Sequence, residues 1–417
     1  MKRLITIVAV VLVIVSVQAQ DIAYARKIMH KLTSPAMKGR GYVKQGDKKA
    51  AGFVVRQFKK LELSSFTDDY FQPYTFPMNT LPGKVEVRVN DQKLRPGYDF
   101  VVSSSTPSMK GTYSLIFAPD SLYNDSTFAL YLEGLKFENS FLVVKGKLRK
   151  HYGKTIPGLK GVILLTDKQP WWHVSNGAEV VSTCWIKGKA EYFPPEAKSV
   201  TLNIETEFRP SYPTQNVIAY VKGKTDPERF IAFTAHYDHL GMMGKRAYFP
   251  GANDNASGTS MVLDLAAYYS KPENQPEKSI VFMLFSGEEA GLKGSTYYTS
   301  HPLFPLEEID FLINLDMVGT GSEGITVVNT KAYNDVLEAM RAINGEHQYI
   351  PEIKPRGEAC NSDHCPFYQS GVKSIFIYTR GPEHTAYHSV YDTDKDFPFT
   401  AYEGLFRLLT TYVNTLQ

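Results

Sequence analysis

The chain has 417 residues, a length that predicts two or three domains because single hydrophobic cores stop growing at about 250 to 300 residues. Apolar residues make up 43% and charged residues 21%, with 24 Phe and 26 Tyr, which excludes disordered and collagen-like chains. Lys and Arg (46) nearly balance Asp and Glu (43), so the formal net charge is +3. This balance gives no indication of nucleic acid or another polyanion as a partner.

Residues 1–19 have the pattern of a secretory signal peptide. A basic start and an apolar stretch from Leu4 to Val17 lead to a small residue, Ala19, so we expect cleavage before Gln20. The apolar stretch is shorter than the roughly 18 to 20 residues of a spanning helix, and no Cys follows it that a lipid could modify. We therefore expect a periplasmic or extracellular protein without stable membrane insertion.

The beginning of the mature chain is predicted to be helical and the next part β-rich. Apolar residues at helical spacing predict helices over Ile22–Leu32 and Lys48–Leu61. From about residue 82 to residue 205, short runs such as VEVRV, GVILLT and VTLNIE alternate with Gly, Pro and Asn, which predicts a β-rich module. All three Trp residues lie in this module: Trp171, Trp172 and Trp185.

The rest of the chain alternates apolar strands with helices. The runs NVIAYV, FIAFTA, SIVFMLF, FLINL and SIFIYT alternate with predicted helices over Ser257–Tyr269, Leu292–Ser300, Ala332–Ile343 and Ala401–Leu416. Strands that are apolar throughout indicate a mainly parallel sheet buried on both faces. We predict one α/β domain formed by residues 20–81 and 206–417, interrupted by an inserted β-rich domain of residues 82–205.

Polar residues follow the apolar runs at the points where the predicted strands end. They are His236 and Asp238 after FIAFTA, Asp254 in the next loop, Glu288 and Glu289 after MLFSG, Asp316 after FLINL, and His388 in the loop after IFIYT. Chemistry in open α/β sheets collects at the carboxyl ends of the strands, so we expect these residues to meet. Imidazole and carboxylate without thiolate form the ligand set of hydrolytic zinc sites. One ion needs three ligands, and the surplus predicts two ions about 3.5 to 4 Å apart with a bridging carboxylate.

For two of these residues, taken singly, a purely structural role is the preferred interpretation. An isolated His236 fits a satisfied, half-buried His, and Asp254 between two Asn fits turn chemistry. Asp238, however, lies two residues after His236 on the same strand face, where it can fix the imidazole tautomer of a metal ligand. The adjacent carboxylates of Glu288 and Glu289 repel each other unless a cation neutralises one, which leaves the other to accept a proton from water.

Six motifs resemble, in the same order, those of the M28 family of co-catalytic zinc peptidases. They are AHYDHLG (235–241), GANDNASGTS (251–260), FSGEEAGLKGS (285–295), NLDMVG (314–319), SDHCPF (362–367) and YHSVYDT (387–393). The resemblance spans the whole predicted α/β part. It implies a three-layer α/β/α sandwich around a mixed sheet, two zinc ions per chain and a peptide substrate.

The resemblance also implies a role for each site residue. It assigns five ligands to the two zinc ions: Asp254 between them, Glu289 and His388 on one, and His236 and Asp316 on the other. It makes Glu288 the general base, Asp238 the partner of His236, and Tyr387 a hydroxyl that contacts the oxyanion. The inserted module occupies the position of the protease-associated domain that many secreted members carry.

Three Cys residues are too few for a disulfide framework. Cys360 and Cys365 are close enough in sequence to pair in an oxidising compartment, which would leave Cys184 unpaired, and the alternative is two buried thiols. Some members of the resembled family have a disulfide beside the substrate pocket, near the position of Cys360 and Cys365.

The function predicted from these features is a secreted dizinc aminopeptidase. A carboxypeptidase is the alternative within the peptidases, since no Arg in a motif is assigned to a substrate carboxylate. A glutaminyl cyclase-like acyltransferase shares the fold and the Glu-Glu pair but uses a single zinc and departs from the NDNASG loop. The string GTGSEG (319–324) matches a dinucleotide-binding fingerprint, but ITVV after it predicts a strand where that motif requires a helix.

Overall fold

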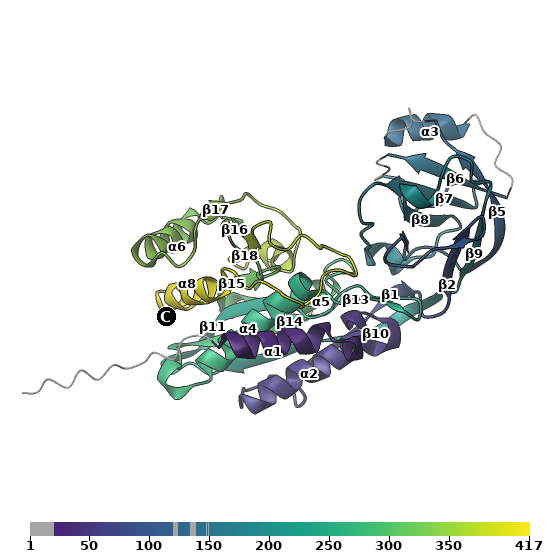
Figure 1. The fold of residues 1–417 in the computed structure, drawn as a ribbon. Helices are drawn as coiled ribbons and strands as arrows, with labels where there is room; N and C mark the ends of the chain where they lie inside the picture. Colours follow the sequence, from purple (N-terminus) through teal and green to yellow (C-terminus); the bar gives the residue numbers. More distant parts are fainter. Residues whose placement is uncertain (1–20, 120–123, 134–138, 147, 149) are drawn as a thin grey trace, which may run out of the picture.

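The protein is described from a computed structural model that covers residues 21–119, 124–133, 139–146, 148 and 150–417 (Figure 1). The predicted signal peptide, residues 1–19, lies outside the described residues. Within the described ranges, no helix combines the length and the hydropathy needed to cross a membrane.

The larger part of the chain is built on an eight-stranded mixed sheet within the described residues. In spatial order its strands are β1 (Phe71–Thr80), β10 (Glu207–Val221), β14 (Lys278–Phe285), β11 (Asp226–His236), β15 (Ile309–Leu315), β18 (Ser374–Arg380), β16 (Gly324–Val328) and β17 (Ile353–Pro355). The four central strands, β14, β11, β15 and β18, run parallel to one another. Strands β1, β10 and β16 pair antiparallel at the two sides, so the sheet is mixed, as predicted.

Helices cover both faces of this sheet. One face packs against α1 (Ile22–Thr33), α2 (Gly46–Lys60), α4 (Gly258–Tyr269), α6 (Asn334–His347) and α8 (Tyr402–Asn414), and the other against α5 (Lys293–Ser300) and α7 (His364–Gln369). Helices are needed on both faces because both faces of the sheet are apolar. On strand β11, Ile231 and Phe233 lie in the hydrophobic core on one face, and Phe230 and Ala232 lie in the core on the other. The α/β fold class, with three layers, is confirmed.

The helix bounds follow from caps and apolar spacing. The side chain of Asp21 accepts hydrogen bonds from the N–H groups of Ala23 and Tyr24 at the start of α1. Helix α6 extends to His347, beyond the Ile343 predicted from the sequence. Its last turn is polar and carries no apolar periodicity, so the pattern in the sequence ends before the helix does.

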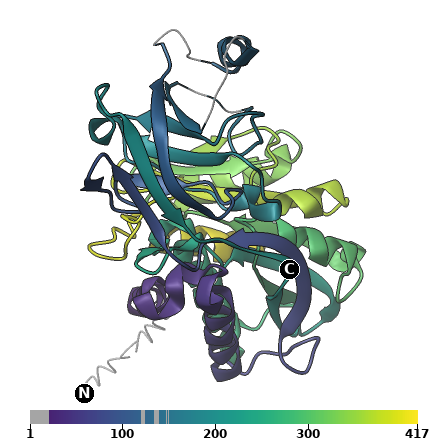
Figure 2. The same ribbon diagram turned by 90° about the vertical axis from the view of Figure 1, so that its right-hand side faces the viewer.

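A second eight-stranded sheet lies beside the first and is formed by the part of the chain between β1 and β10 (Figures 1 and 2). Its strands are β3 (Gln92–Lys93), β2 (Val85–Val89), β9 (Ser199–Ile204), β5 (Met109–Phe117), β6 (Ser140–Lys145), β7 (Gly161–Thr166), β8 (Cys184–Lys189) and β4 (Phe100–Val102), in spatial order. Helix α3 (Asp125–Glu133) packs on one face through Phe128. We propose residues 82–205 as the bounds of this inserted module.

The other face of the module packs on the α/β part. Its core is continuous with Tyr42, Tyr74 and the hairpin of β12 (Gly241–Met243) and β13 (Ala247–Phe249). The ring of Trp172 lies 4.9 Å from that of Phe249, between centroids, across this boundary. The shared core fixes the module against the α/β part near the loop that follows β18.

The three Trp residues of the module differ in burial. Trp172 and Trp185 are buried and donate their indole N–H groups to the carbonyls of Val102 and Lys154, at 2.7 Å in each case. Trp171 remains 44% exposed. Two of the three indoles therefore fill cores, and the third remains partly exposed.

This difference predicts unequal losses of stability from two matched substitutions. Trp185→Ala removes a fully buried ring and is expected to lower the free energy of unfolding of the module by about 3 to 5 kcal/mol. Trp171→Ala removes a half-exposed ring and should cost less than about 1 kcal/mol. Urea unfolding followed by tryptophan fluorescence measures both, and equal losses would contradict the assignment of Trp185 to the core.

Candidate active site

The parallel strands bring the predicted site residues to one edge of the sheet. His236 is the last residue of β11, and it pairs in register with Phe285, the last residue of β14. Glu288 and Glu289 follow β14 after a short turn, and Asp316 follows β15 directly. Because parallel neighbours end at the same edge, residues far apart in sequence lie within contact distance.

Asp254 lies between two His–carboxylate pairs. Its Oδ1 lies 3.4 Å from His236 Nε2, which is itself 3.4 Å from Asp316 Oδ1. Its Oδ2 lies 3.0 Å from His388 Nε2, which is 3.2 Å from Glu289 Oε2. The two oxygens of one carboxylate thus face two separate sets of donors, and all five residues assigned to zinc from the sequence meet here.

These donors are buried and incompletely paired. All five side chains belong to buried residues. Among the described residues, His236 Nε2 and Asp316 Oδ1 face each other without a hydrogen-bond partner. A buried polar atom without a partner costs about 1 to 3 kcal/mol, so the set fits a bound cation better than a closed hydrogen-bond network.

The charges shift the pKa values in opposite directions. Burial alone would lower the pKa of His236, but the carboxylates of Asp316 and Glu288 raise it well above its ordinary value. Burial opposes the charged form of Asp254, yet the adjacent imidazoles of His236 and His388 hold its pKa well below the ordinary value. Where their Nε2 atoms contact the carboxylates, the imidazoles therefore carry the positive charge that a bound cation would supply.

Glu288 differs from the other carboxylates of the site. Its Oε2 lies 3.9 Å from His236 Nε2, at the margin of the cluster, and its side chain is 15% exposed. Burial raises its pKa well above the ordinary value, and the charges of Asp363 and Asp316 add to this effect. A carboxylate that favours a proton and faces the open side of the cluster has the properties of a general base.

Asp238 connects His236 to Glu288. Its Oδ1 lies 3.5 Å from His236 Nδ1 and accepts a hydrogen bond of 3.3 Å from the backbone N–H of Glu288. Its Oδ2 accepts a hydrogen bond of 2.7 Å from the hydroxyl of Tyr42, whose pKa burial and Asp238 raise. Tyr42 was not found from the sequence, because it lies 196 residues away in a turn without a motif.

The loop that carries Asp254 is held by a second buried acid. Asp392 accepts hydrogen bonds from the backbone N–H groups of Asn253 (2.8 Å) and Asp254 (3.1 Å). His384 Nε2 lies 2.7 Å from the same carboxylate. Asp392 belongs to the YHSVYDT motif, but its partner atoms are backbone groups that no sequence pattern reveals.

Arg40 holds the other side of this loop. Its fully buried guanidinium donates to the carbonyls of Tyr237 (2.8 Å), Pro250 (2.5 Å) and Gly251 (2.8 Å). The adjacent Gly41 is required by space, since a Cβ there would lie 2.5 Å from the Cα of Gly241. In the sequence, Arg40 lies between the two predicted N-terminal helices without a motif around it, so the guanidinium was missed.

His239 is a further residue that sequence reasoning missed. It is fully buried, and its Nδ1 lies 2.6 Å from Glu289 Oε1, on the side of that carboxylate opposite to His388. His239, Asp254 and Glu289 form one of two groups with metal-binding geometry among the described residues, and His236, Glu288 and Asp316 form the other. The repeated His of the A-H-Y-D-H motif was the available signal.

The module closes one side of the site through the loop after β18. The ring of Tyr387 stacks on that of His388 at 3.8 Å between centroids. The ring of His173, from the module, lies 5.1 Å from that of His388. The backbone N–H of Trp172 donates a hydrogen bond to the backbone carbonyl of His388. The module therefore contacts the segment that carries His388, although the ligand atoms themselves belong to the α/β part.

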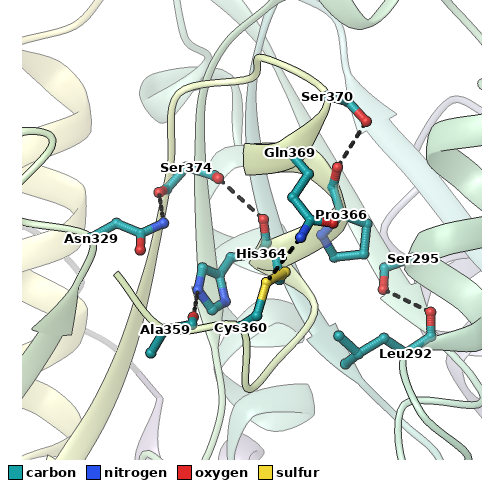
Figure 3. The surroundings of a disulfide bond; sticks show 11 residues. Leu292, Ser295, Asn329, Ala359, Cys360, His364, Pro366, Gln369, Ser370 and Ser374 are labelled. Carbon is teal, nitrogen blue, oxygen red and sulfur yellow. Dashed lines mark hydrogen bonds between the residues drawn. A yellow bond between two sulfur atoms is a disulfide. The ribbon is translucent and has the colours of Figure 1, made fainter. Parts of the chain in front are cut away.

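Cys360 and Cys365 form a disulfide bond in the segment before and within α7 (Figure 3). Of the two alternatives left open by the sequence, the structure has the paired one, and Cys184 is a buried free thiol whose pKa burial raises to about 12. The bridged segment includes Ser362, which donates to Asp316 Oδ2 at 2.7 Å. The disulfide therefore restrains the segment that orients Asp316.

Comparisons with known proteins find similarity to peptidases. Residues 216–413 match the model of Peptidase family M28. Aminopeptidase YwaD of Bacillus subtilis (strain 168) is 30% identical over 294 residues, which is 65% of this chain and 62% of YwaD. A probable zinc metalloprotease of Pyrenophora tritici-repentis is 33% identical over 153 residues, 34% of this chain and 31% of that protein. The chain thus spans less than two thirds of these relatives.

Solved structures share the fold over nearly the whole chain. BSAP, a zinc aminopeptidase from Bacillus subtilis, superposes with a TM-score of 0.70 at 22% identity, covering 94% of each chain. The aminopeptidase from Aneurinibacillus sp. strain AM-1 gives a TM-score of 0.66 at 20% identity, covering 95% of this chain and 93% of its own. The likeness includes the inserted module, because the α/β part alone could not give this coverage.

The hydrogen bonds of Asp392 predict an effect on stability. Asp392→Asn turns one acceptor into a donor that faces backbone N–H groups, so we expect a loss of about 1 to 3 kcal/mol in the free energy of unfolding. Asp394→Asn removes the same charge from a surface pair with His30 and should cost less than about 1 kcal/mol. Urea unfolding of the two variants tests this, and equal losses would contradict the anchoring role.

Proposed function

We propose that this chain is an aminopeptidase of peptidase family M28 that binds two zinc ions and removes N-terminal residues from peptides. The observation that carries the proposal is Asp254, whose two oxygens face two separate His–carboxylate pairs. A bridging carboxylate between two donor sets is the arrangement that a two-metal hydrolytic site requires.

The residues divide into two ligand sets in this proposal. Asp254 serves both ions, and the ligands that complete the sets are His236 with Asp316 and His388 with Glu289. When bound, zinc polarises a substrate carbonyl and lowers the pKa of water towards about 7. His239, at 2.6 Å from Glu289 Oε1, orients that carboxylate so that its other oxygen faces His388.

The proton is moved by Glu288. Its raised pKa and its place at the open side of the cluster support the acceptance of a proton from the attacking water and its return to the leaving amine. The carboxylate of Asp238 contacts both the imidazole of His236 and the backbone N–H of Glu288, and so fixes their positions relative to each other. Burial and the charges of Asp254 and Glu289 raise the pKa of Tyr387, which keeps its hydroxyl protonated to donate to the developing oxyanion.

Cleavage from the N-terminus is supported by charge and by relatives. The free amine of a peptide is attracted by the carboxylates of Glu288, Glu289 and Asp316, which lie at one edge of the sheet. YwaD is named an aminopeptidase and BSAP a zinc aminopeptidase. The Cys360–Cys365 disulfide supports an oxidising location, in the periplasm or outside the cell, as the signal-peptide pattern predicts.

Two substitutions separate the ligand from the base. Glu288→Gln removes a proton acceptor outside the five proposed ligands, so we expect zinc content to stay at two ions per chain while kcat falls by about 10²- to 10⁴-fold. Asp254→Ala removes the shared ligand and should lower the zinc content as well. Elemental analysis with kinetics measures both, with the exposed Glu273→Gln as control. Loss of zinc in Glu288→Gln would reverse the roles of the two glutamates.

Direction of cleavage is tested with matched substrates. A free amine contributes binding at the carboxylate cluster and a blocked amine does not, so aminoacyl-p-nitroanilides should have kcat/KM values at least about tenfold above those of their N-acetyl forms. Chelation should abolish both activities and zinc should restore them. Equal rates for free and blocked substrates would indicate a carboxypeptidase or an endopeptidase. Release of pyroglutamate from an N-terminal Gln without peptide cleavage would indicate a glutaminyl cyclase.

A further inference from the structure

We propose that the inserted module provides a carboxylate-binding subsite beside the catalytic centre, with Lys187 as its cation. The subsite would favour peptides that carry a carboxylate shortly after the N-terminal residue, either as an acidic side chain or as the C-terminus of a very short peptide. This inference rests on the proposed aminopeptidase function and names its substrate class.

Lys187 is a partly buried cation without an anion. It lies on β8, and none of the carboxylates in the described ranges forms an ion pair with it. Burial lowers its pKa to about 8, and no neighbouring acid opposes this shift, so most of it is still charged at neutral pH. A partly buried ammonium without a counter-ion is costly, and a bound carboxylate would remove that cost.

Two aromatic rings fix the position of this ammonium. Lys187 Nζ lies 4.2 Å from the ring centroid of Trp171 and 4.4 Å from that of Tyr152. Both contacts are cation–π interactions, which hold the group through the ring faces without using its N–H donors in hydrogen bonds to an anion. Within the described residues Lys187 Nζ donates no hydrogen bond to an oxygen or nitrogen atom, so its N–H groups that do not face the rings are available to a ligand.

The same rings connect Lys187 to the catalytic centre. The ring of Trp171 lies 6.5 Å from the rings of both Tyr387 and His388, and the ring of His173 lies between Trp171 (4.2 Å) and His388 (5.1 Å). Trp171 and Tyr387 are 44% and 45% exposed, so both rings are partly accessible to a substrate. At roughly 3.3 to 3.6 Å per extended residue, a group one or two residues beyond the scissile bond can reach Lys187.

The two sides of the site then carry opposite charge. The α/β part presents the carboxylates of Glu288, Glu289 and Asp316, which attract the free amine of the substrate. The module presents Lys187 next to the Trp171 ring. A short peptide with an amine at one end and a carboxylate at the other matches this arrangement, and its charges set its direction in the site.

The test compares three substrates that differ only in the carboxylate: leucyl-glutamine amide, leucyl-glutamate amide and leucyl-glutamine. The first has no carboxylate, the second has one on the side chain, and the third has one at the C-terminus. With zinc present, we expect kcat/KM for at least one carboxylate substrate to exceed that for the neutral amide by about fivefold or more. Which of the two exceeds it identifies the source of the carboxylate.

Variants assign the preference to Lys187. Lys187→Met keeps most of the stem and removes the charge, so the ratio of carboxylate to neutral substrate should fall to about one, whereas Lys187→Arg should retain it. Lys189→Met is the matched control, because Lys189 is two residues along β8 and near Asp99, and its ratio should equal that of the wild type. Ratios measured within each variant do not depend on how much of the protein is folded.

Each result decides one of the two proposals. A wild-type ratio near one for both carboxylates, or an unchanged ratio in Lys187→Met, would overturn the subsite while leaving the aminopeptidase function in place. Absence of any hydrolysis of all three substrates by the zinc-loaded wild type would instead overturn the proposed function, and the subsite with it.

Discussion

The concentration of negative charge at one buried edge of the sheet is the constraint on which the rest of this structure depends. Asp238, Asp254, Glu289 and Asp316 are buried within contact distance of two imidazoles, at a cost that only paired or metal-bound carboxylates can offset. The central parallel strands make this concentration possible, because their carboxyl ends coincide. The residues around the cluster then serve to keep like charges at fixed positions.

Two kinds of support hold these positions. Asp392 accepts from the backbone at Asp254, and Arg40 donates to the carbonyls of the same loop, so the proposed bridging residue is restrained from both sides. Tyr42 restrains Asp238, and Ser362, within the disulfide-bridged segment, restrains Asp316. Except for Asp392, which contacts only the backbone of the loop, each support is a neutral hydrogen-bond donor or a cation, which avoids adding further negative charge at the reacting atoms.

The inserted module changes what the site can recognise. The α/β part supplies acids and imidazoles, while the module supplies rings, from Trp171 and His173, and the cation Lys187. The module is held by a core that it shares with the β12–β13 hairpin, so its approach to His388 is built into the fold. Proposed catalysis and proposed selectivity therefore come from different parts of the chain.

The sequence by itself determined the fold class, the order of the main helices and strands, and which His and carboxylate residues gather, because these depend on local periodicity and on the position of polar residues at strand ends. It also marked the β-rich interruption. Only the tertiary structure decided that Arg40 and Tyr42 belong to the site, that His239 faces Glu289, that the cysteines pair, and that Trp171 lies over Lys187. Apart from the cysteines, which lie five residues apart, these contacts join segments whose separation in the chain carries no pattern, so packing brings them together.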